Sequence, residues 1–135
     1  MPLPTGIATV TVTGKLLTPD GAGASGSIQF IPNNGVLYAG QDVVTVPKAV
    51  VVNLGAGGDF SVVLPATDDT AGNPVGWTWH VNERVKGGRE FNIALPKTPD
   101  TTDYSSLVPV PATDGTAVIV GPPGPALTAI DGGSL

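Results

Sequence analysis

The sequence GWTWHVNERVKGGREFNIALP, residues 76–96, contains both tryptophans and the single histidine of the chain. Apolar residues alternate with polar ones on either side of the Gly87-Gly88 pair, and these apolar residues are Trp77, Trp79, Val81, Phe91, Ile93 and Leu95. Alternation of this kind is typical of strands with one buried face. The stretch therefore predicts a β-hairpin that turns at the two glycines and buries both tryptophans.

The two apolar rows restrict the length of the turn. A two-residue loop would place the rows on opposite faces, because a one-residue slip moves every side chain to the other face. A three-residue loop, residues 86–88, places both rows on one face and sets Val81 opposite Ile93. It also sets Arg84 opposite Glu90 as a cross-strand charge pair. We expect this loop, with a glycine in the left-handed conformation.

The composition excludes several classes of protein. The chain has 135 residues, of which 19 are glycine and 14 proline, and a high content of these residues predicts many turns. A formal net charge of −5 argues against nucleic-acid or anionic-membrane binding. No apolar run is long enough for a membrane helix, and the start, MPLP, lacks the features of a signal peptide. The absence of cysteine excludes disulfides and thiol chemistry.

Shorter alternating segments follow one another before the hairpin. We expect strands at residues 7–17, 26–32, 49–54 and 60–64, and a bulged strand at 36–46. Their inward rows are Val10, Val12 and Leu16, then Ile28 and Phe30, then Phe60, Val62 and Leu64. No helical period is visible. About seven short strands with frequent turns predict an all-β, antiparallel β-sandwich of the immunoglobulin-like or transthyretin-like kind.

The sequence divides into four parts. We expect an N-terminal arm at residues 1–6, the sandwich domain at 7–97, an extended segment with a short strand at 98–120, and a collagen-like tail at 121–135. The tail begins with two Gly-X-Y triplets, GPPGPA. Proline presets the extended backbone that such triplets need. The run is either a polyproline-II linker or a threefold junction between copies.

Residues that carry chemistry are few. His80 lies on the polar face of the hairpin by alternation, and no nucleophile elbow accompanies it. Asp68 and Asp69 lack the spacing of a calcium loop, so they are expected to form turns. Arg84, Lys86 and Arg89 form a solvated hairpin end or contact a neighbouring subunit. We expect no catalytic residue, no metal and no cofactor.

Four aromatic residues are candidates for stacking on a carbohydrate, namely Trp77, Trp79, Tyr38 and Tyr104. Stacking requires exposed rings, whereas the alternation places the two tryptophans on the buried face. We therefore expect these rings in the core. An exposed tryptophan would instead favour a module that binds glycan or protein on a host surface.

Two resemblances extend this interpretation. The first 65 residues resemble transthyretin-like or carboxypeptidase-regulatory-like modules, through VTGKL (12–16), the turn PDG (19–21) and GDFSVVLP (58–65). Nearly the whole chain is similar to N-terminal regions of minor tail and fibre proteins from phages of actinobacteria. This second resemblance is carried by the tryptophan strand, then DYSSLVPV (103–110), then GPPGP (121–125). The sequence departs from that pattern after Ala126, where nine residues follow, and we expect no long stalk and no receptor-binding tip.

The phage resemblance implies a structural virion protein, a minor tail, fibre, adaptor or decoration subunit made in the host cytoplasm. It implies assembly without catalysis, as a homo-oligomer, with a trimer favoured, and with other virion proteins. The alternative is a host-surface binding module that recognises glycan or protein. We expect the contacts to involve the terminal segments, namely Tyr104, Leu107, Val108, Pro122 and Pro123.

Overall fold

A computed structural model describes residues 3 and 6–117 of the chain. Its strands are β1 Thr9–Lys15, β2 Gly26–Pro32, β3 Val36–Tyr38, β4 Val43–Thr45, β5 Val50–Asn53, β6 Asp59–Pro65, β7 Trp79–Val85, β8 Glu90–Ile93 and β9 Thr101–Asp103. Two short 3-10 turns, η1 Ala39–Gln41 and η2 Tyr104–Ser106, complete the elements. In this part of the chain no helix is long and apolar enough to cross a membrane.

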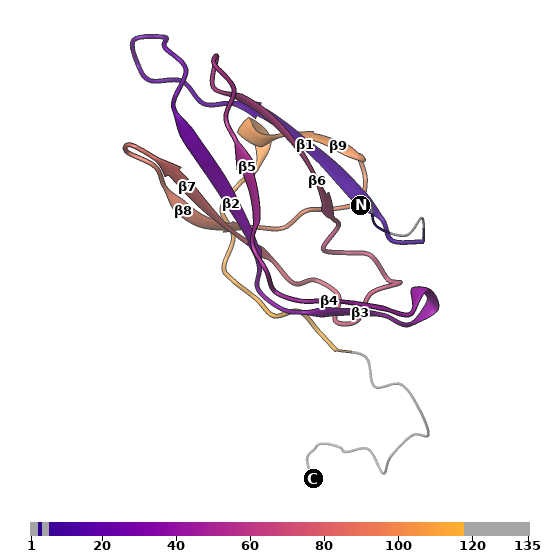
Figure 1. The fold of residues 1–135 in the computed structure, drawn as a ribbon. Coiled ribbons are helices and arrows are strands. Elements are labelled where there is room, and N and C mark those ends of the chain that lie inside the picture. Colours follow the sequence, from indigo (N-terminus) through magenta and orange to yellow (C-terminus); the bar gives the residue numbers. More distant parts are fainter. Residues whose placement is uncertain (1–2, 4–5, 118–135) are drawn as a thin grey trace, which may run out of the picture.

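The strands form a sandwich of two sheets, as the sequence predicts (Figure 1). One sheet has the order β6-β1-β9, and the other has the order β5-β2-β7-β8. Strands β3 and β4 form a separate small hairpin. The expectation of a purely antiparallel sandwich is wrong in one place, because β9 runs parallel to β1.

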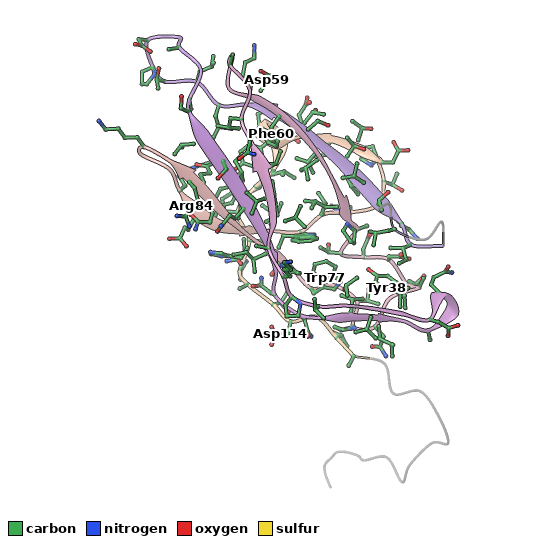
Figure 2. The ribbon with its side chains drawn as sticks, in the orientation of Figure 1. Tyr38, Asp59, Phe60, Trp77, Arg84 and Asp114 are labelled. Atoms are coloured by element: carbon green, nitrogen blue, oxygen red, sulfur yellow. The ribbon has the colours of Figure 1, made fainter. Side chains whose placement is uncertain are left out.

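The core lies between the two sheets and is built from the alternating rows (Figure 2). Val10 and Val12 of β1 face Ile28 and Phe30 of β2 within one cluster, and all four are fully buried. Both tryptophans are buried at 2% exposure. Burying a large apolar side chain stabilises the fold by about 1.5–3 kcal/mol, so these rows hold the sheets together.

The register of the β7–β8 hairpin differs from the prediction by two residues. Trp79 lies opposite Ile93 and Val81 opposite Phe91, so the apolar rows do share one face. The loop is longer than three residues, because the last pairing joins Glu83 N–H to the carbonyl of Arg89. A glycine in the loop, Gly87, has φ +80° and is left-handed, as expected. 

The predicted pair of Arg84 with Glu90 is wrong for the same reason. The shift of two residues places Glu90 opposite Asn82, within reach of His80, whose Nε2 lies 3.1 Å from Glu90 Oε1. Glu83 instead pairs with Arg89. The hairpin therefore carries a Glu83–Arg89 ion pair and a His80–Glu90 contact, neither of which a three-residue loop predicts.

The segment at 36–46 is a hairpin and not a bulged strand. Strands β3 and β4 pair through Val36–Thr45 and Tyr38–Val43, with η1 between them. The turn closes at Asp42, which has φ +53°. Aspartate tolerates the left-handed conformation better than most residues.

The residues after Lys97 continue the sandwich. Strand β9 pairs with β1, and Tyr104 enters the core, so a boundary at residue 97 does not separate them from the domain. Of the strand expected at 116–120, Thr116 forms a bridge with Val75, and residues 118–120 lie outside the described residues. The expected tail, residues 121–135, lies outside them too, as does most of the N-terminal arm.

Candidate functional site

The four aromatic rings considered for carbohydrate stacking are all buried. Trp77 and Trp79 pack with their ring centroids 5.2 Å apart, and Trp79 Nε1 donates to the carbonyl of Pro65. Burial, with Asp69 nearby, raises the pKa of Tyr38 to about 12. Both tryptophans are only 2% exposed, although they line the wall of a depression of about 220 Å³ together with Leu3. A well-exposed tryptophan, which a host-surface binding module requires, is not found among the described residues.

The other candidates for chemistry form structural contacts. Asp69 accepts from the N–H groups of Ala8 and Ala71, and Asp68 accepts from that of Lys97. Within residues 3 and 6–117, no group of three or more metal-ligating side chains is present. The aspartates at 68 and 69 therefore hold the loop between β6 and β7 in place.

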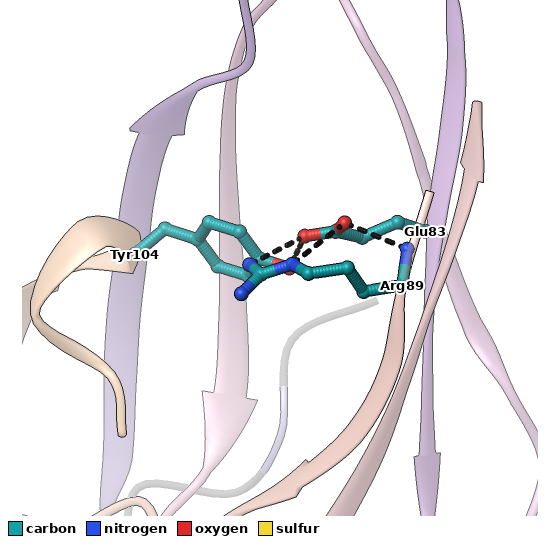
Figure 3. A network of polar contacts seen from close by, with 3 residues as sticks. All are labelled: Glu83, Arg89 and Tyr104. Carbon is teal, nitrogen blue, oxygen red and sulfur yellow. Dashed lines mark hydrogen bonds and ion pairs between the residues drawn. The ribbon is translucent and has the colours of Figure 1, made fainter. Parts of the chain in front are cut away.

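The most distinctive polar arrangement lies where β7, β8 and η2 meet (Figure 3). The Glu83 carboxylate is buried and accepts a hydrogen bond from Tyr104 Oη. Arg89 donates to both carboxylate oxygens, from Nε at 3.2 Å and from a terminal nitrogen at 3.0 Å, and its backbone N–H donates as well. Charge-assisted, bidentate bonds of this kind are among the stronger ones in proteins.

Alternation in the hairpin already indicates that Glu83 is buried. It follows Trp79 and Val81 on the inward row at a spacing of two residues. A carboxylate at such a position needs a cation and hydrogen-bond donors, because an unpaired buried charge is costly. Arg89 can be identified as this cation only when the register of the β7–β8 hairpin is known. Tyr104 lies in a segment without alternation, so the sequence does not indicate that its hydroxyl donates to Glu83.

Tyr104 is an anchor and not a surface contact. Its ring packs edge-on against Phe60 at 5.2 Å and Phe30 at 6.4 Å, and tilted against Phe91 at 6.2 Å. The guanidinium of Arg89 lies 4.5 Å from the centre of the Phe91 ring. The expectation that Tyr104 contacts a partner is not met in this fold, because its side chain is buried within its own chain.

The network shifts the pKa of all three of its members, and the hydrogen bond with Glu83 raises the pKa of Arg89. Burial raises the pKa of the Tyr104 hydroxyl, and the hydrogen bond to Glu83 raises it further. Burial alone would raise the pKa of Glu83, but hydrogen bonds from Arg89 and Tyr104 outweigh it and lower the pKa below its ordinary value of 4.5. The folded protein therefore holds Glu83 ionised and Tyr104 neutral.

This shift predicts a stability that falls in acid. A carboxyl group with a lowered folded pKa stabilises the fold above its unfolded pKa, and this contribution is lost as the pH falls through the folded value. We expect the free energy of unfolding to decline below about pH 4.5. In Glu83→Gln the decline should flatten, with a loss of about 1–2 kcal/mol at pH 7. Urea titrations between pH 3 and 7 measure both effects.

Glu90→Gln is the matched control for this prediction, because the Glu90 side chain is 65% exposed. It should change the stability at pH 7 by less than about 0.5 kcal/mol. A Glu83→Gln protein with the same pH dependence as the unchanged chain would contradict the assignment.

Tyr104 fastens a longer segment, residues 98–117, which we name the strap. The strap begins beside β1, where the N–H of Thr11 donates to the carbonyl of Asp100. It then passes to the other sheet, where Val110 N–H donates to the carbonyl of Asn92. Farther on it bonds with Thr78 through Thr113, and with Val75 through Thr116. The strap thus closes the side of the sandwich formed by β9 and β8.

The remaining predicted contact residues lie on the strap or beyond it. Leu107 is partly buried against the core, and Val108 is 71% exposed. Both line a depression of about 440 Å³ at the surface of the strap, together with apolar side chains that include Ala94, Pro96, Pro99 and Val110. Pro122 and Pro123 lie outside the described residues. Leu107 and Val108 therefore belong to one apolar surface depression on the strap.

In comparisons with known proteins, no family model, curated protein or solved structure matches the chain.

Proposed function

We propose that this chain is a structural component of a phage virion, in the tail or its fibres, that acts by assembly and without catalysis. The observation that supports the proposal best is the strap. Its backbone is fixed to both sheets, and it presents an apolar depression lined by Leu107 and Val108. The order of a tryptophan strand, a DYSSLVPV segment and a GPPGP run is similar to the N-terminal regions of phage tail and fibre proteins.

The strap would serve assembly by holding an apolar contact surface at low entropic cost. A flexible segment loses conformational freedom when it binds, and this loss weakens the complex. The Tyr104 anchor removes that loss in advance, because the residues on both sides of Leu107 and Val108 are already hydrogen-bonded to the sandwich. Copies of the chain, with a trimer favoured, and other virion proteins would then pack on this surface.

Recognition of host glycan or protein is the rival function. It requires an exposed aromatic platform, and the tryptophans and tyrosines of the described residues are buried. The virion assembly proposal is therefore the one that the arrangement of the strap favours.

The mass of the chain in solution tests the proposal. A trimer of the 13.5 kDa chain should be found by light scattering, and it should fall to smaller species in a version that ends at residue 120. Val108→Asp should also weaken the trimer, because it places a charge in the apolar depression, while the melting temperature stays within about 2 °C. Val44→Asp, at another exposed valine, is the control.

Two outcomes would count against this function. A monomer for the full chain and for the shortened chain would favour the host-surface module. A trimer that Val108→Asp leaves intact would remove the strap from the contact.

A further inference from the structure

The strap covers only one of the two open sides of the sandwich. The side of β8 and β9 is crossed by the strap, whereas β5 and β6 end their sheets on the other side. These two strands leave the same tight turn, in which Gly55 N–H donates to the carbonyl of Asp59, and enter different sheets (Figure 1). Within residues 3 and 6–117, no strand pairs with the outer edge of either.

The hydrogen bonds at the two ends of β6 identify its free backbone groups. Leu16 N–H donates to the carbonyl of Gly58, and Ala66 N–H donates to that of Ala8. Bonding residues alternate along an antiparallel pair, so the even-numbered residues of β6 face β1. The backbone groups of Ser61 and Val63 therefore point away from the sheet, and no hydrogen bond among the described residues uses them.

The middle of this edge lacks the features that normally protect an exposed strand, and Asp59 and Pro65 stand only at the two ends of β6. Natural edge strands are blunted by charges, prolines or bulges. Residues 60–64, FSVVL, contain no charge and no proline, and their register with β1 has no bulge. Val63 is 57% exposed, and Val51 on neighbouring β5 is 53% exposed.

The net charge of the chain opposes contact between two copies over most of their surfaces, so a contact between copies requires an uncharged segment. Copies that each carry a net charge of −5 repel one another over most of their surfaces. At residues 60–64 two copies meet without opposing like charges. The outward groups of this segment are also complementary to themselves, as a twofold contact requires.

We propose that β6 is a contact between two copies of this chain, paired antiparallel around a twofold axis at Val62. In this register Ser61 lies opposite Val63 of the second copy, and every outward N–H and C=O of these residues finds a partner. A register centred on Val63 would set Ser61 against Pro65, which has no N–H and whose carbonyl already accepts from Trp79. Val62, only partly buried in one copy, packs against its counterpart.

The result is one continuous sheet in the order β9-β1-β6-β6-β1-β9. The contact is separate from the strap, and it stands whether or not the chain belongs to a virion.

Val63→Pro in the full chain tests the pairing. Proline removes only the outward N–H of residue 63, because the N–H groups bonded to β1 belong to the even-numbered positions. The donor is lost in both copies, which should weaken the pairing about 30-fold. Sedimentation equilibrium over a range of concentrations should show that the mass of the variant is half that of the unchanged chain. Halving is expected whether the starting species is a dimer or a pair of trimers.

Val63→Thr retains the N–H and the branched shape, so it should keep the full mass. Hydrogen exchange on the unchanged chain gives a second readout that does not depend on the folding of a variant. The amides of Ser61 and Val63 should be protected at high concentration and lose protection on dilution. Equal masses for Val63→Pro and the unchanged chain, or fast exchange of both amides at all concentrations, would overturn the proposal. If Val108→Asp lowers the mass and Val63→Pro does not, the interface lies on the strap and β6 is not part of it.

Discussion

Tyr104→Ala is expected to lower the free energy of unfolding by about 3–5 kcal/mol, the largest loss from any single side chain discussed here. The ring packs among Phe30, Phe60 and Phe91, so its removal leaves a cavity that rigid sheets cannot close. The substitution also removes a hydrogen bond from the buried carboxylate of Glu83. Urea unfolding followed by tryptophan fluorescence measures the loss.

Tyr104→Phe separates the two parts of this effect. It keeps the ring and removes the hydroxyl, and a lost hydrogen bond to a buried charge costs about 1–3 kcal/mol. Val108→Ala, an exposed position on the same strap, should cost less than about 0.5 kcal/mol. Equal stabilities for Tyr104→Ala and Val108→Ala would show that the ring does not anchor the strap.

Gly58→Ala is expected to destabilise the fold by at least about 2–4 kcal/mol. Gly58 has φ +80°, and a Cβ at this position would lie 2.0 Å from the carbonyl oxygen of Leu16. That oxygen belongs to the backbone and accepts a hydrogen bond from the N–H of Ala24. It cannot move aside without breaking this hydrogen bond, which closes the loop after β1. Thermal unfolding followed by circular dichroism measures the change.

Gly57→Ala is the matched control in the same turn. Its Cβ would meet only Asp59 Oδ1, at 3.4 Å, and its φ is not in the left-handed region. It should leave the stability within about 1 kcal/mol. Similar losses at positions 57 and 58 would indicate that the turn is sensitive to any side chain and not to this close approach.

Local patterns in the sequence predict the strands with one buried face. The bounds of β2 are those expected, and the inward rows of β1 and β6 follow the alternation. An odd number of residues in the loop also correctly places the two apolar rows of the hairpin on one face. These features depend on residues close in sequence, where side-chain alternation is the controlling property.

Contacts between distant segments were not predictable in the same way. The pairing of β9 with β1 joins a three-residue strand to the start of the chain, and so short a strand has no period of its own. The hairpin register was missed because a loop length was assumed, and Gly88, which approaches the carbonyl of Glu83, permits a longer one. The Glu83–Arg89–Tyr104 network depends on both of these features.

The position of β1 between β6 and β9 implies an order of folding. Among the described strands β1 is synthesised first, yet both of its neighbours come from much later in the chain. Pairings between residues far apart in sequence form slowly because a long loop must first be closed. On the ribosome both edges of β1 stay unpaired until β6 emerges, and one stays open until Thr101–Asp103 has been made. The strap is therefore the last part of the sandwich to form, and its docking marks the completed domain.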